Sequence, residues 1–364
     1  MNVRKHIIKN YRNINELELE PVDGVNVIFG DNGQGKTNII ESIWLFTGCN
    51  SFRTRKNIEL IKNGCENAEL SMDFYAGDRE QNARLVINTV KETFINDIRQ
   101  VSARSLLGRF QAIVFSPAFL SVIKDGPSER RRFIDTAISL IKPNYAALLL
   151  KYNKTLFQRN SLLRQISVNK TGDELLYAFD EELAKYGGRI IDYRVKYIDD
   201  LKNYVPDIYS GISKGREKIK IKYTGSLKEK CADSAEYSRL LYDETVRNHE
   251  RDIFRQTTNF GPHKDDLDIF LDDLNVRIYG SQGQQRSGAL ALKLSEAEII
   301  KEISGEKPVA LLDDVMSELD DKRQKYLIKY FDGWQVFVTC CDRAHLKKIR
   351  YDKSFRITDG RLWE

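Results

Sequence analysis

The sequence predicts an α/β fold that a mostly helical lobe interrupts, and three observations support this. A compact apolar run at 25–29 ends at a glycine-rich loop, after which apolar residues recur every three or four positions. This order predicts a buried strand followed by a helix. From 122 to 254 most of the apolar spacing is helical, and beyond 255 short strand-like runs return. We therefore expect one discontinuous α/β domain, 1–121 with 255–364, around a helical lobe at 122–254.

The individual elements are expected in chain order, from apolar runs bounded by turn residues or from helical periodicity. We expect 267–271 and 276–279 to pair as a hairpin around Asp272 and Asp273, and Gly187-Gly188 to break or bend a long helix. The expected strands are 7–8, 17–19, 25–29, 112–115, 218–223, 267–271, 276–279, 308–312 and 334–338. The expected helices are 39–46, 128–141, 143–166, 173–204, 235–254 and 290–300.

Composition excludes several classes of protein. The chain has 364 residues, 41% of them hydrophobic and 30% charged, which is neither a disordered nor a fibrous composition. The net charge of +5 permits a nucleic-acid partner without demanding one. No apolar run reaches the roughly 18 residues of a membrane span, and the first residues are unlike a secretory signal. The five cysteines form no Cys-x-x-Cys pair, so we expect no zinc site or disulfide framework, and a cytoplasmic location.

A phosphate-binding loop follows the strand at 25–29. The segment matches G-x-x-x-x-G-K-[ST], whose glycines let successive backbone N–H groups face an anion at a helix N-terminus. Lys36 is expected along the β- and γ-phosphates, and the Thr37 hydroxyl on Mg²⁺. A chance glycine-rich turn would lack the flanking strand and helix. The ATP-binding residues expected are Gly30, Asp31, Asn32, Gly33, Gln34, Gly35, Lys36, Thr37 and Asn38.

Two adjacent carboxylates end the strand at 308–312. Asp313 stands at the Walker B position and is expected to hold Mg²⁺ through water. A second carboxylate beside it is electrostatically unfavourable, which suggests that Asp314 positions the attacking water. The alternative is that Asp314 only caps or solvates a loop. We expect Asp314 and Lys36 to be the catalytic residues.

The string Ser281-Gln282-Gly283-Gln284 resembles the signature motif of ABC-type ATPases. In that class, the motif starts a helix whose N-terminus reaches the γ-phosphate bound by the opposite subunit. The resemblance implies two chains with two ATP molecules between them. Ser317 and Asp320 lie in a segment similar to the D-loop, which crosses the same interface. Ser281 as a simple helix cap is the alternative, and the order of the four motifs argues against it.

Several further segments, spread over nearly the whole chain, resemble the RecF family of bacterial recombination-mediator ATPases, which is related to the SMC proteins. They are Asn10-Tyr11-Arg12-Asn13, Gly30 to Asn38, Ser51-Phe52-Arg53-Thr54, Gly126-Pro127, Arg130 to Asp135, Gln158-Arg159-Asn160, Leu162-Leu163, Gly261 to Leu267, Gly280 to Arg286 and Leu311 to Asp320.

The resemblance implies an ABC/SMC-like ATPase head with an inserted helical lobe in place of a long coiled coil. It also implies ATP-dependent dimerisation on duplex or gapped DNA, independent of DNA sequence, and slow, DNA-stimulated hydrolysis that releases the dimer. The implied role is recombinational gap repair, replication restart and SOS induction, with RecO- and RecR-type proteins as partners. Arg53 or Arg55 is implied near the nucleotide.

At three positions the sequence departs from the motifs of ABC transporters or of RecF relatives. Cys340 follows Val338-Thr339, where ABC transporters usually carry a histidine that senses the γ-phosphate. Ser116-Pro117 stands in the region where transporters carry a glutamine, and Phe52 where RecF relatives often have histidine. These departures are consistent with slow hydrolysis and argue against a transporter motor.

Three basic clusters are candidates for DNA contact: Arg130-Arg131-Arg132, Lys214 to Lys222, and Lys347-Lys348 with Arg350. Such clusters are often merely solvated surface, and the alternative is contact with the phosphate backbone. Arg130, Arg131 and Arg132 are the preferred candidates. Other functions left open are a nucleotide-bound scaffold that does not hydrolyse ATP and an ABC transporter motor; a P-loop kinase would have no use for the signature motif.

Overall fold

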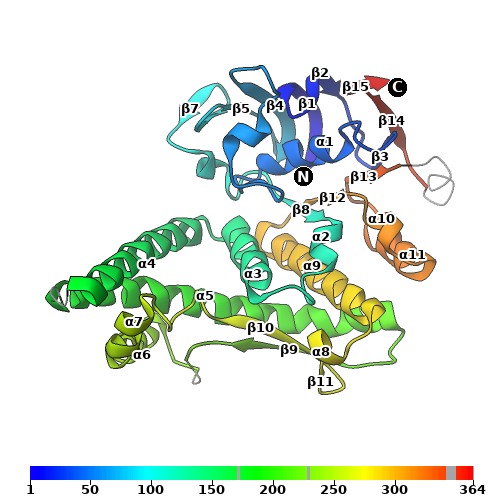
Figure 1. Cartoon of the computed structure of the whole chain (residues 1–364). Coiled ribbons are helices and arrows are strands. Elements are labelled where there is room, and N and C mark those ends of the chain that lie inside the picture. The colour runs from blue at the N-terminus through cyan, green and yellow to red at the C-terminus, as the bar shows by residue number, and fades with distance from the viewer. Residues whose placement is uncertain (170–172, 228–229, 342–349, 364) are drawn as a thin grey trace. The chain divides into compact units, whose positions relative to one another are not determined.

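The computed structural model describes residues 1–169, 173–227, 230–341 and 350–363. The chain forms two compact units (Figure 1). The first, an α/β unit, contains residues 1–121, 207–217 and 282–364, and the second, a mostly helical unit, contains 122–206 and 218–281. The α/β class and the insertion of a helical lobe agree with the sequence expectation.

The boundaries of the units differ from the expected ones. Residues 255–281 belong to the helical unit because their strand β10 (Asp266–Leu271) pairs with β9 (Ile219–Thr224) of that unit. Residues 207–217 belong to the α/β unit, since the end of the long helix α5 (Asp173–Ser213) packs there: the Tyr326 hydroxyl donates to the Ile208 carbonyl at 3.3 Å.

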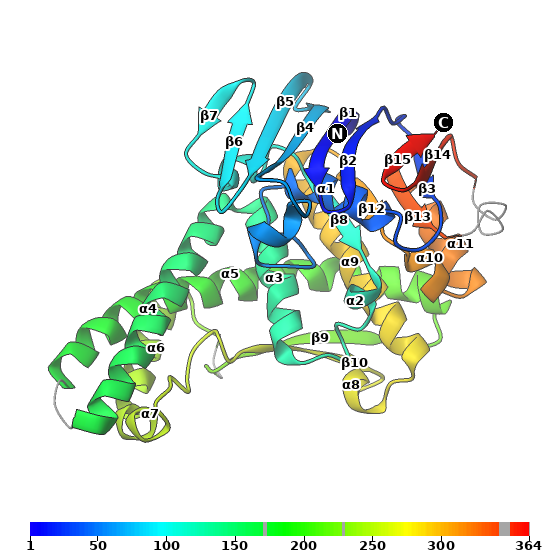
Figure 2. The ribbon, with the colours of Figure 1, turned by 45° about the horizontal axis from the view of Figure 1, so that its top comes forward.

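One sheet of the α/β unit is antiparallel, with strand order β2-β1-β4-β5-β6-β7 (Figure 2). In β4 and most of β5 buried residues alternate with partly buried ones, which places one face of the sheet on the core. Its long pairings join β1 to β4 and β4 to β5, and the predicted strands at 7–8 and 17–19 lie within β1 and β2. The strands are β1 (Asn2–Tyr11), β2 (Ile14–Leu19), β4 (Ala68–Ala76), β5 (Arg79–Ile87), β6 (Lys91–Ile95) and β7 (Ile98–Gln100).

The second sheet of this unit has the order β15-β14-β3-β13-β12-β8, and every pair in it except β14–β15 is parallel. Its central strands are buried along their whole length, as expected when both faces of a parallel sheet are covered. The strands are β3 (Val25–Phe29), β8 (Ala112–Phe115), β12 (Val309–Leu312), β13 (Val336–Cys340), β14 (Lys353–Thr358) and β15 (Arg361–Trp363).

Helix α1 (Lys36–Leu45) contacts both sheets: β1 of the antiparallel sheet and β8, β12 and β13 of the parallel one. This explains why eight of its ten residues, including Lys36 and Glu41, are buried. The parallel sheet and α1 therefore hold the glycine loop between β3 and α1 rigidly. The remaining helical elements of the unit are η1 (Asn57–Leu60), η2 (Ala103–Leu106), α2 (Pro117–Leu120), α9 (Gln282–Ser304), α10 (Val315–Glu318) and α11 (Asp321–Tyr330).

In the helical unit, α5 runs uninterrupted through Gly187 and Gly188, where a break or bend was expected. The two glycines instead allow close packing against α6, since a Cβ on Gly188 would lie 2.4 Å from the Ser238 nitrogen and one on Gly187 2.4 Å from a Leu241 methyl. The helices of the unit are α3 (Pro127–Ile141), α4 (Pro143–Asn169), the first part of α5, α6 (Ser234–Arg247), α7 (His249–Arg255) and α8 (Val276–Tyr279).

A three-stranded sheet of order β11-β10-β9 completes this unit. The predicted turn at Asp272 and Asp273 is present, and both residues have positive φ. The second strand of the predicted hairpin is wrong: β11 covers only Leu274–Asn275, and 276–279 forms α8. The Asn275 side chain accepts a hydrogen bond from the Arg277 N–H at 3.0 Å, so it caps the helix and ends the strand.

No helix in the described part of the chain is both long and apolar enough to cross a membrane.

Candidate active site

The glycine loop that joins β3 to α1 forms the floor of the candidate site. Gly33 and Gly35 have φ values of 81° and 111°, a region that side chains with a Cβ rarely adopt. A Cβ on Gly35 would also lie 2.8 Å from the Asn13 side-chain oxygen. Glycine is therefore needed for the loop to curl into the N-terminus of α1, and that helix end favours bound anions.

Lys36 lies across this loop. Its ammonium donates to the carbonyl oxygens of Gly30 at 2.6 Å and Asp31 at 2.8 Å, and only 7% of the residue is exposed. Both acceptors are neutral, so no carboxylate neutralises the charge of the ammonium at these two bonds. The arrangement holds a cation over the anion-binding end of α1, as the motif predicts.

Thr37, Asp313 and Thr339 form a hydrogen-bonded group beside the loop. The Asp313 carboxylate oxygen Oδ1 accepts from the Thr37 hydroxyl at 2.8 Å and from the Thr339 hydroxyl at 3.0 Å. The three residues meet because β3, β13 and β12 are parallel neighbours whose carboxyl ends share one sheet edge. Burial raises the pKa of Asp313, and its charged neighbour Asp314 acts in the same direction, while the two hydroxyls partly offset them.

Asp314 follows in a left-handed backbone conformation, with φ 52° and ψ 16°. Its backbone N–H donates to the Thr339 hydroxyl at 2.8 Å, which fixes the turn. The Cys341 thiol lies 3.8 Å from the Asp314 carboxylate and 2.8 Å from the Asn32 side-chain oxygen. Cys341, the residue after the one singled out in the sequence, therefore faces the phosphate loop, whereas Cys340 is buried as the last residue of β13.

The family motifs near Arg12 and Arg53 converge on one buried carboxylate of α1. Glu41 accepts from the Arg12 guanidinium at 2.8 and 3.0 Å and from the Ser51 hydroxyl at 2.5 Å. Burial by itself would raise the pKa of Glu41, but these donors outweigh it and the pKa is lowered. Arg53, 42% exposed, also donates to the Asn38 side chain at 2.7 Å, so it lies at the rim of the loop as expected.

The signature helix and the D-loop segment are joined within the α/β unit. Ser281 directly precedes α9, and Gly283 lies in its first turn. The Arg323 guanidinium donates to the Gly283 carbonyl at 2.8 Å, to the Ser287 hydroxyl at 2.8 Å and to the Asp320 carboxylate at 2.9 Å. The first turns of α9 and the predicted D-loop are therefore held together by one side chain, which the sequence alone did not single out.

A second tie strengthens this junction. Arg286 donates to the backbone carbonyl and to the carboxylate of Glu318, both at 2.6 Å, and the Ser317 hydroxyl donates to the Asp314 carbonyl at 2.7 Å. Gln284 is anchored separately, through a 2.6 Å bond to Glu217. The signature helix thus contacts the segment that starts at Asp314.

The phosphate loop itself has different partners. Its hydrogen bonds within the described residues include those with Asn13, Arg53, Asp313 and Cys341, and one that the Asp359 backbone N–H donates to the Gln34 side chain. The hydrogen bonds of Gly283, Gln284 and Arg286 described above reach Arg323, Glu217 and Glu318.

The donor set fits a nucleotide with Mg²⁺. The loop offers backbone N–H groups and one ammonium to phosphate oxygens, and Thr37 with Asp313 offers the oxygen ligands that Mg²⁺ prefers alongside water and phosphate. Among the described residues there is no group of three or more His, Cys, Asp or Glu side chains that would hold a metal without such help.

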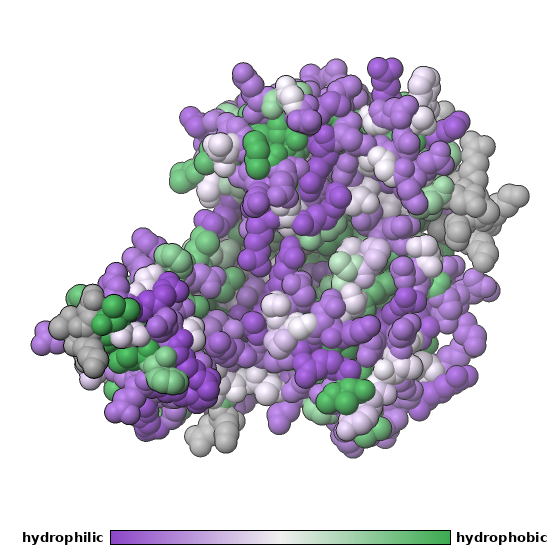
Figure 3. Space-filling view, viewed as in Figure 1, coloured by the Kyte–Doolittle hydropathy of each residue, from purple (hydrophilic) through white to green (hydrophobic). Residues whose placement is uncertain are grey.

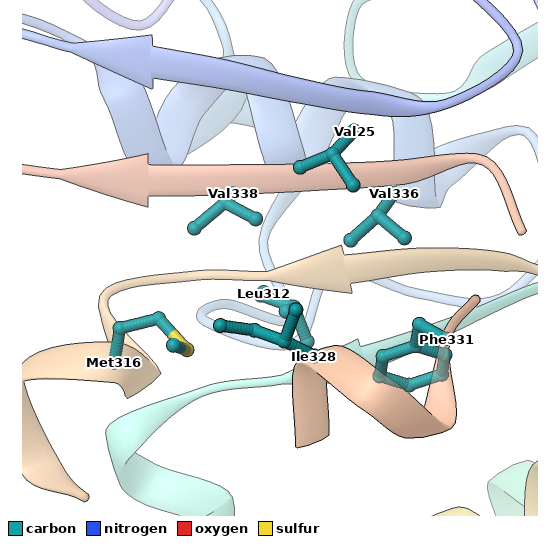
Figure 4. A pocket seen from close by; sticks show the side chains of 7 residues that line it. All are labelled: Val25, Leu312, Met316, Ile328, Phe331, Val336 and Val338. Carbon is teal, nitrogen blue, oxygen red and sulfur yellow. The ribbon is translucent and has the colours of Figure 1, made fainter. Parts of the chain in front are cut away.

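A small pocket lies near the site but has different chemistry (Figure 4). Seven side chains from the parallel sheet, α10 and α11 line it, and all seven are apolar: Val25, Leu312, Met316, Ile328, Phe331, Val336 and Val338. With no polar group to orient a ligand, it is a gap in the packing of the core.

The three arginines predicted to contact DNA have different environments. Arg130 does not fit that prediction: it is 2% exposed, donates to both Asp266 carboxylate oxygens at 2.7 and 2.8 Å, and also bonds three backbone carbonyls. Arg131 donates to the Asp265 carbonyl at 2.8 Å. Arg132 is 38% exposed, 3.8 Å from the Glu129 carboxylate. Lys347 and Lys348 of another predicted cluster lie outside the described residues.

Comparison with known proteins gives consistent matches over the whole chain. The family model described as RecF/RecN/SMC N terminal domain matches residues 2–361. The chain is 41% identical to the DNA replication and repair protein RecF of Caldanaerobacter subterraneus subsp. tengcongensis, over 99% of both chains. It is 38% identical to the protein of the same name from Clostridium perfringens (strain SM101 / Type A), over 97% of both chains.

Solved structures agree. The structure of the recombination mediator protein RecF-ATPrS in the RecFOR pathway superposes with a TM-score of 0.93 at 39% identity, over 99% of this chain and 97% of that one. The Smc head domain of Pyrococcus furiosus bound to the C-terminal domain of ScpA superposes with a TM-score of 0.56 at 17% identity, over 99% and 94% of the two chains. The latter likeness concerns the fold alone.

Proposed function

The chain belongs to the RecF family, and from that premise we propose that it is an ATP-dependent, DNA-binding recombination mediator. Its relatives are named as DNA replication and repair proteins, and structures of one have been solved with ATP and with ATPrS. Together with the intact phosphate loop, this supports ATP binding and a general role in DNA replication and repair.

The residues of the loop have distinct roles in holding ATP. The N–H groups at the start of α1 and the Lys36 ammonium hold the β- and γ-phosphates, and Lys36 exchanges its two carbonyl acceptors for phosphate oxygens. Thr37 and Asp313 hold Mg²⁺, which supplies positive charge against the phosphates when bound. Asn38 and Arg53 lie at the rim, in reach of the same ligand.

Asp314 positions and deprotonates the attacking water. It is the second carboxylate of the pair, and it is oriented by its own backbone turn and by Thr339. In place of the sensing histidine of transporter motors stands the Cys341 thiol, a weak hydrogen-bond donor. We expect hydrolysis to be slow for this reason, as suits a switch that releases a complex.

The observation that carries the dimer proposal is the attachment of the signature helix to the D-loop segment. The signature helix is fixed to the D-loop by Arg323 and Arg286. A helix N-terminus that binds anions and is joined to a segment of the D-loop type is suited to the γ-phosphate held by a second copy. ATP would then join two heads on DNA, and hydrolysis would separate them.

In this proposal the dimer acts at gapped DNA together with RecO- and RecR-type proteins, in recombinational gap repair, replication restart and SOS induction. The pathway named for the solved relative supports these partners.

Light scattering with and without ATP tests the dimer. We expect the mass of the parent chain to double with ATP and Mg²⁺. Ser281→Arg should stay monomeric and still bind ATP, because the arginine side chain blocks the N-terminus of the signature helix and leaves the phosphate loop unchanged. Lys36→Met, the matched control, should lose ATP binding itself. A Ser281→Arg variant that dimerises like the parent would contradict the shared site, and DNA-stimulated phosphate release by the parent would exclude a scaffold without hydrolysis.

A further inference from the structure

The basic strand β9 is neutralised by its neighbour. Lys220 forms an ion pair with Asp273 at 2.7 Å, and Lys222 is in register with Asp268 on β10. Together with the buried Arg130, this accounts for three of the basic side chains in the sequence clusters. A surface whose cations are not paired in this way is therefore a better candidate for contact with a polyanion.

Helix α4 supplies such a surface. Its 27 residues include Lys151, Lys154, Arg159 and Arg164 but no aspartate or glutamate. A helix of this length on a protein surface ordinarily mixes charges of both signs. The absence of carboxylates therefore leaves a positive charge that its own helix does not compensate.

The buried member of this set fixes the rotation of the helix. Arg159 is fully buried and donates to Asp180 at 2.6 Å and to Asp252 at 2.8 Å. At about 100° per residue, Lys151, Lys154 and Arg164 fall within an arc of roughly 140° that excludes Arg159, and Lys154 and Arg164 each lie about 140° from it. All three are exposed, so they form one outward face.

These three cations have no ion pair among the residues that the structure describes. Lys151 lies 6.0 Å from the centre of the Tyr186 ring, and Arg164 donates to the Ser161 hydroxyl at 3.2 Å. From Lys151 to Arg164 the helix rises about 20 Å, which is enough to follow several phosphates.

Large apolar side chains share the same arc. Phe157 is 69% exposed, Val168 76% and Leu150 45%. In the space-filling view the end of the helical unit that carries α4 shows hydrophobic side chains among hydrophilic ones (Figure 3). An exposed aromatic ring between cations is the arrangement that binds single-stranded nucleic acid, because unpaired bases stack on the ring while cations follow the backbone.

We propose that this α4 face, formed by Lys151, Lys154, Phe157 and Arg164, binds the single-stranded segment of gapped DNA. The inference rests on the proposed DNA-binding function and adds the surface and the form of DNA. Duplex DNA offers the same phosphates but keeps its bases stacked, so only a single strand uses Phe157.

Fluorescence anisotropy with labelled single-stranded, duplex and gapped DNA, over a series of salt concentrations, tests the proposal. We expect Lys151→Gln/Lys154→Gln to reduce the slope of log affinity against log salt for the single strand by about 1.4, for two lost phosphate contacts. Phe157→Ala should weaken single-strand and gapped DNA binding by roughly 5-fold or more and leave duplex binding unchanged. Lys220→Gln/Lys222→Gln removes the same charge from the paired strand and should change the slope much less.

The possible results distinguish the proposed DNA-binding function from the proposed role of the α4 face. ATP binding, measured alongside, should be unaltered in every variant, which shows that the fold is kept. If the parent chain binds none of the three DNAs, the proposed function fails. If the parent binds and the α4 variants match it, the α4 face is refuted. Equal losses on duplex and single strand, with no effect of Phe157→Ala, would overturn the assignment to single-stranded DNA.

Discussion

Replacing Asp314 by asparagine tests whether its carboxylate is the catalytic base. The residue has φ 52° and ψ 16°, a left-handed conformation that asparagine tolerates about as well as aspartate. The side chain keeps its shape and loses only its charge and its capacity to accept a proton. Since a positioned general base contributes about 10²- to 10⁴-fold, Asp314→Asn should lose about 3–5 kcal/mol of transition-state stabilisation.

The assay is steady-state phosphate release with saturating ATP and DNA, together with light scattering. Asp314→Asn should bind ATP, release phosphate at least a hundredfold more slowly than the parent, and accumulate as a dimer. Asp314→Ala should lose hydrolysis equally but be less stable by about 1 kcal/mol, because alanine is strained in the left-handed region. Turnover by Asp314→Asn within threefold of the parent would refute the assignment of the base.

Three other predictions concern the packing around the site and in the helical unit. Arg130→Ala should lower the free energy of unfolding by about 3–5 kcal/mol in urea titration, because it leaves the Asp266 carboxylate without its partner. The salt dependence of DNA binding should stay unchanged. Unchanged stability with a weaker salt dependence would instead identify Arg130 as a DNA contact. Arg323→Ala should weaken ATP-dependent dimerisation without changing ATP binding, since it removes the bond between Gly283 and the D-loop. Unchanged dimerisation would show that the Arg323–Gly283 bond is not needed for the dimer. Burial lowers the pKa of His263 to about 4, so the unfolded state takes up a proton first as pH falls from 6.5. This residue alone should lower the stability by up to about 3 kcal/mol between pH 6.5 and 4, in addition to the share of His6, whose pKa burial also lowers to about 4. His263→Gln should remove its own share, and an unchanged pH dependence would contradict this prediction.

Local spacing was sufficient to predict the phosphate loop and its acid. Gly33, Gly35 and Lys36 lie within one turn of chain, and Asp313 ends a strand whose burial is evident from four consecutive apolar residues. Parallel pairing then brings Thr37 and Asp313 together without further information. The resemblance to the RecF family and the α/β class are confirmed for the same reason: they depend on motifs and periodicity that are written along the chain.

Contacts between distant segments could not be predicted from the sequence. Arg130 is buried because Asp266, 136 residues away, receives its guanidinium, so its position in a run of arginines was misleading. The same applies to Arg323, whose partner Gly283 lies 40 residues earlier. In each case the sequence shows a charged residue but not the acceptor that determines its role.

Two other features of the fold could have been predicted from the local sequence. In β4, and in β5 from its third residue on, buried and partly buried residues alternate. This period-two pattern predicts strands, yet β4 and β5 were not among the expected elements. The helix at 276–279 follows Asn275, a favoured cap, although its Val, Ile and Tyr favour a strand by composition. Here the cap outweighed the propensity of the residues.

The most direct test of the shared site is the rate of ATP hydrolysis by a mixture of two inactive variants. Lys36→Met keeps the signature helix and loses the loop, whereas Ser281→Arg keeps the loop and loses the helix tip. If the two half-sites come from different chains, a mixed dimer contains one complete site, and an equimolar mixture should recover hydrolysis that neither variant shows alone. A mixture no more active than the sum of its parts, although both variants are folded, would contradict an ATP site built from two copies.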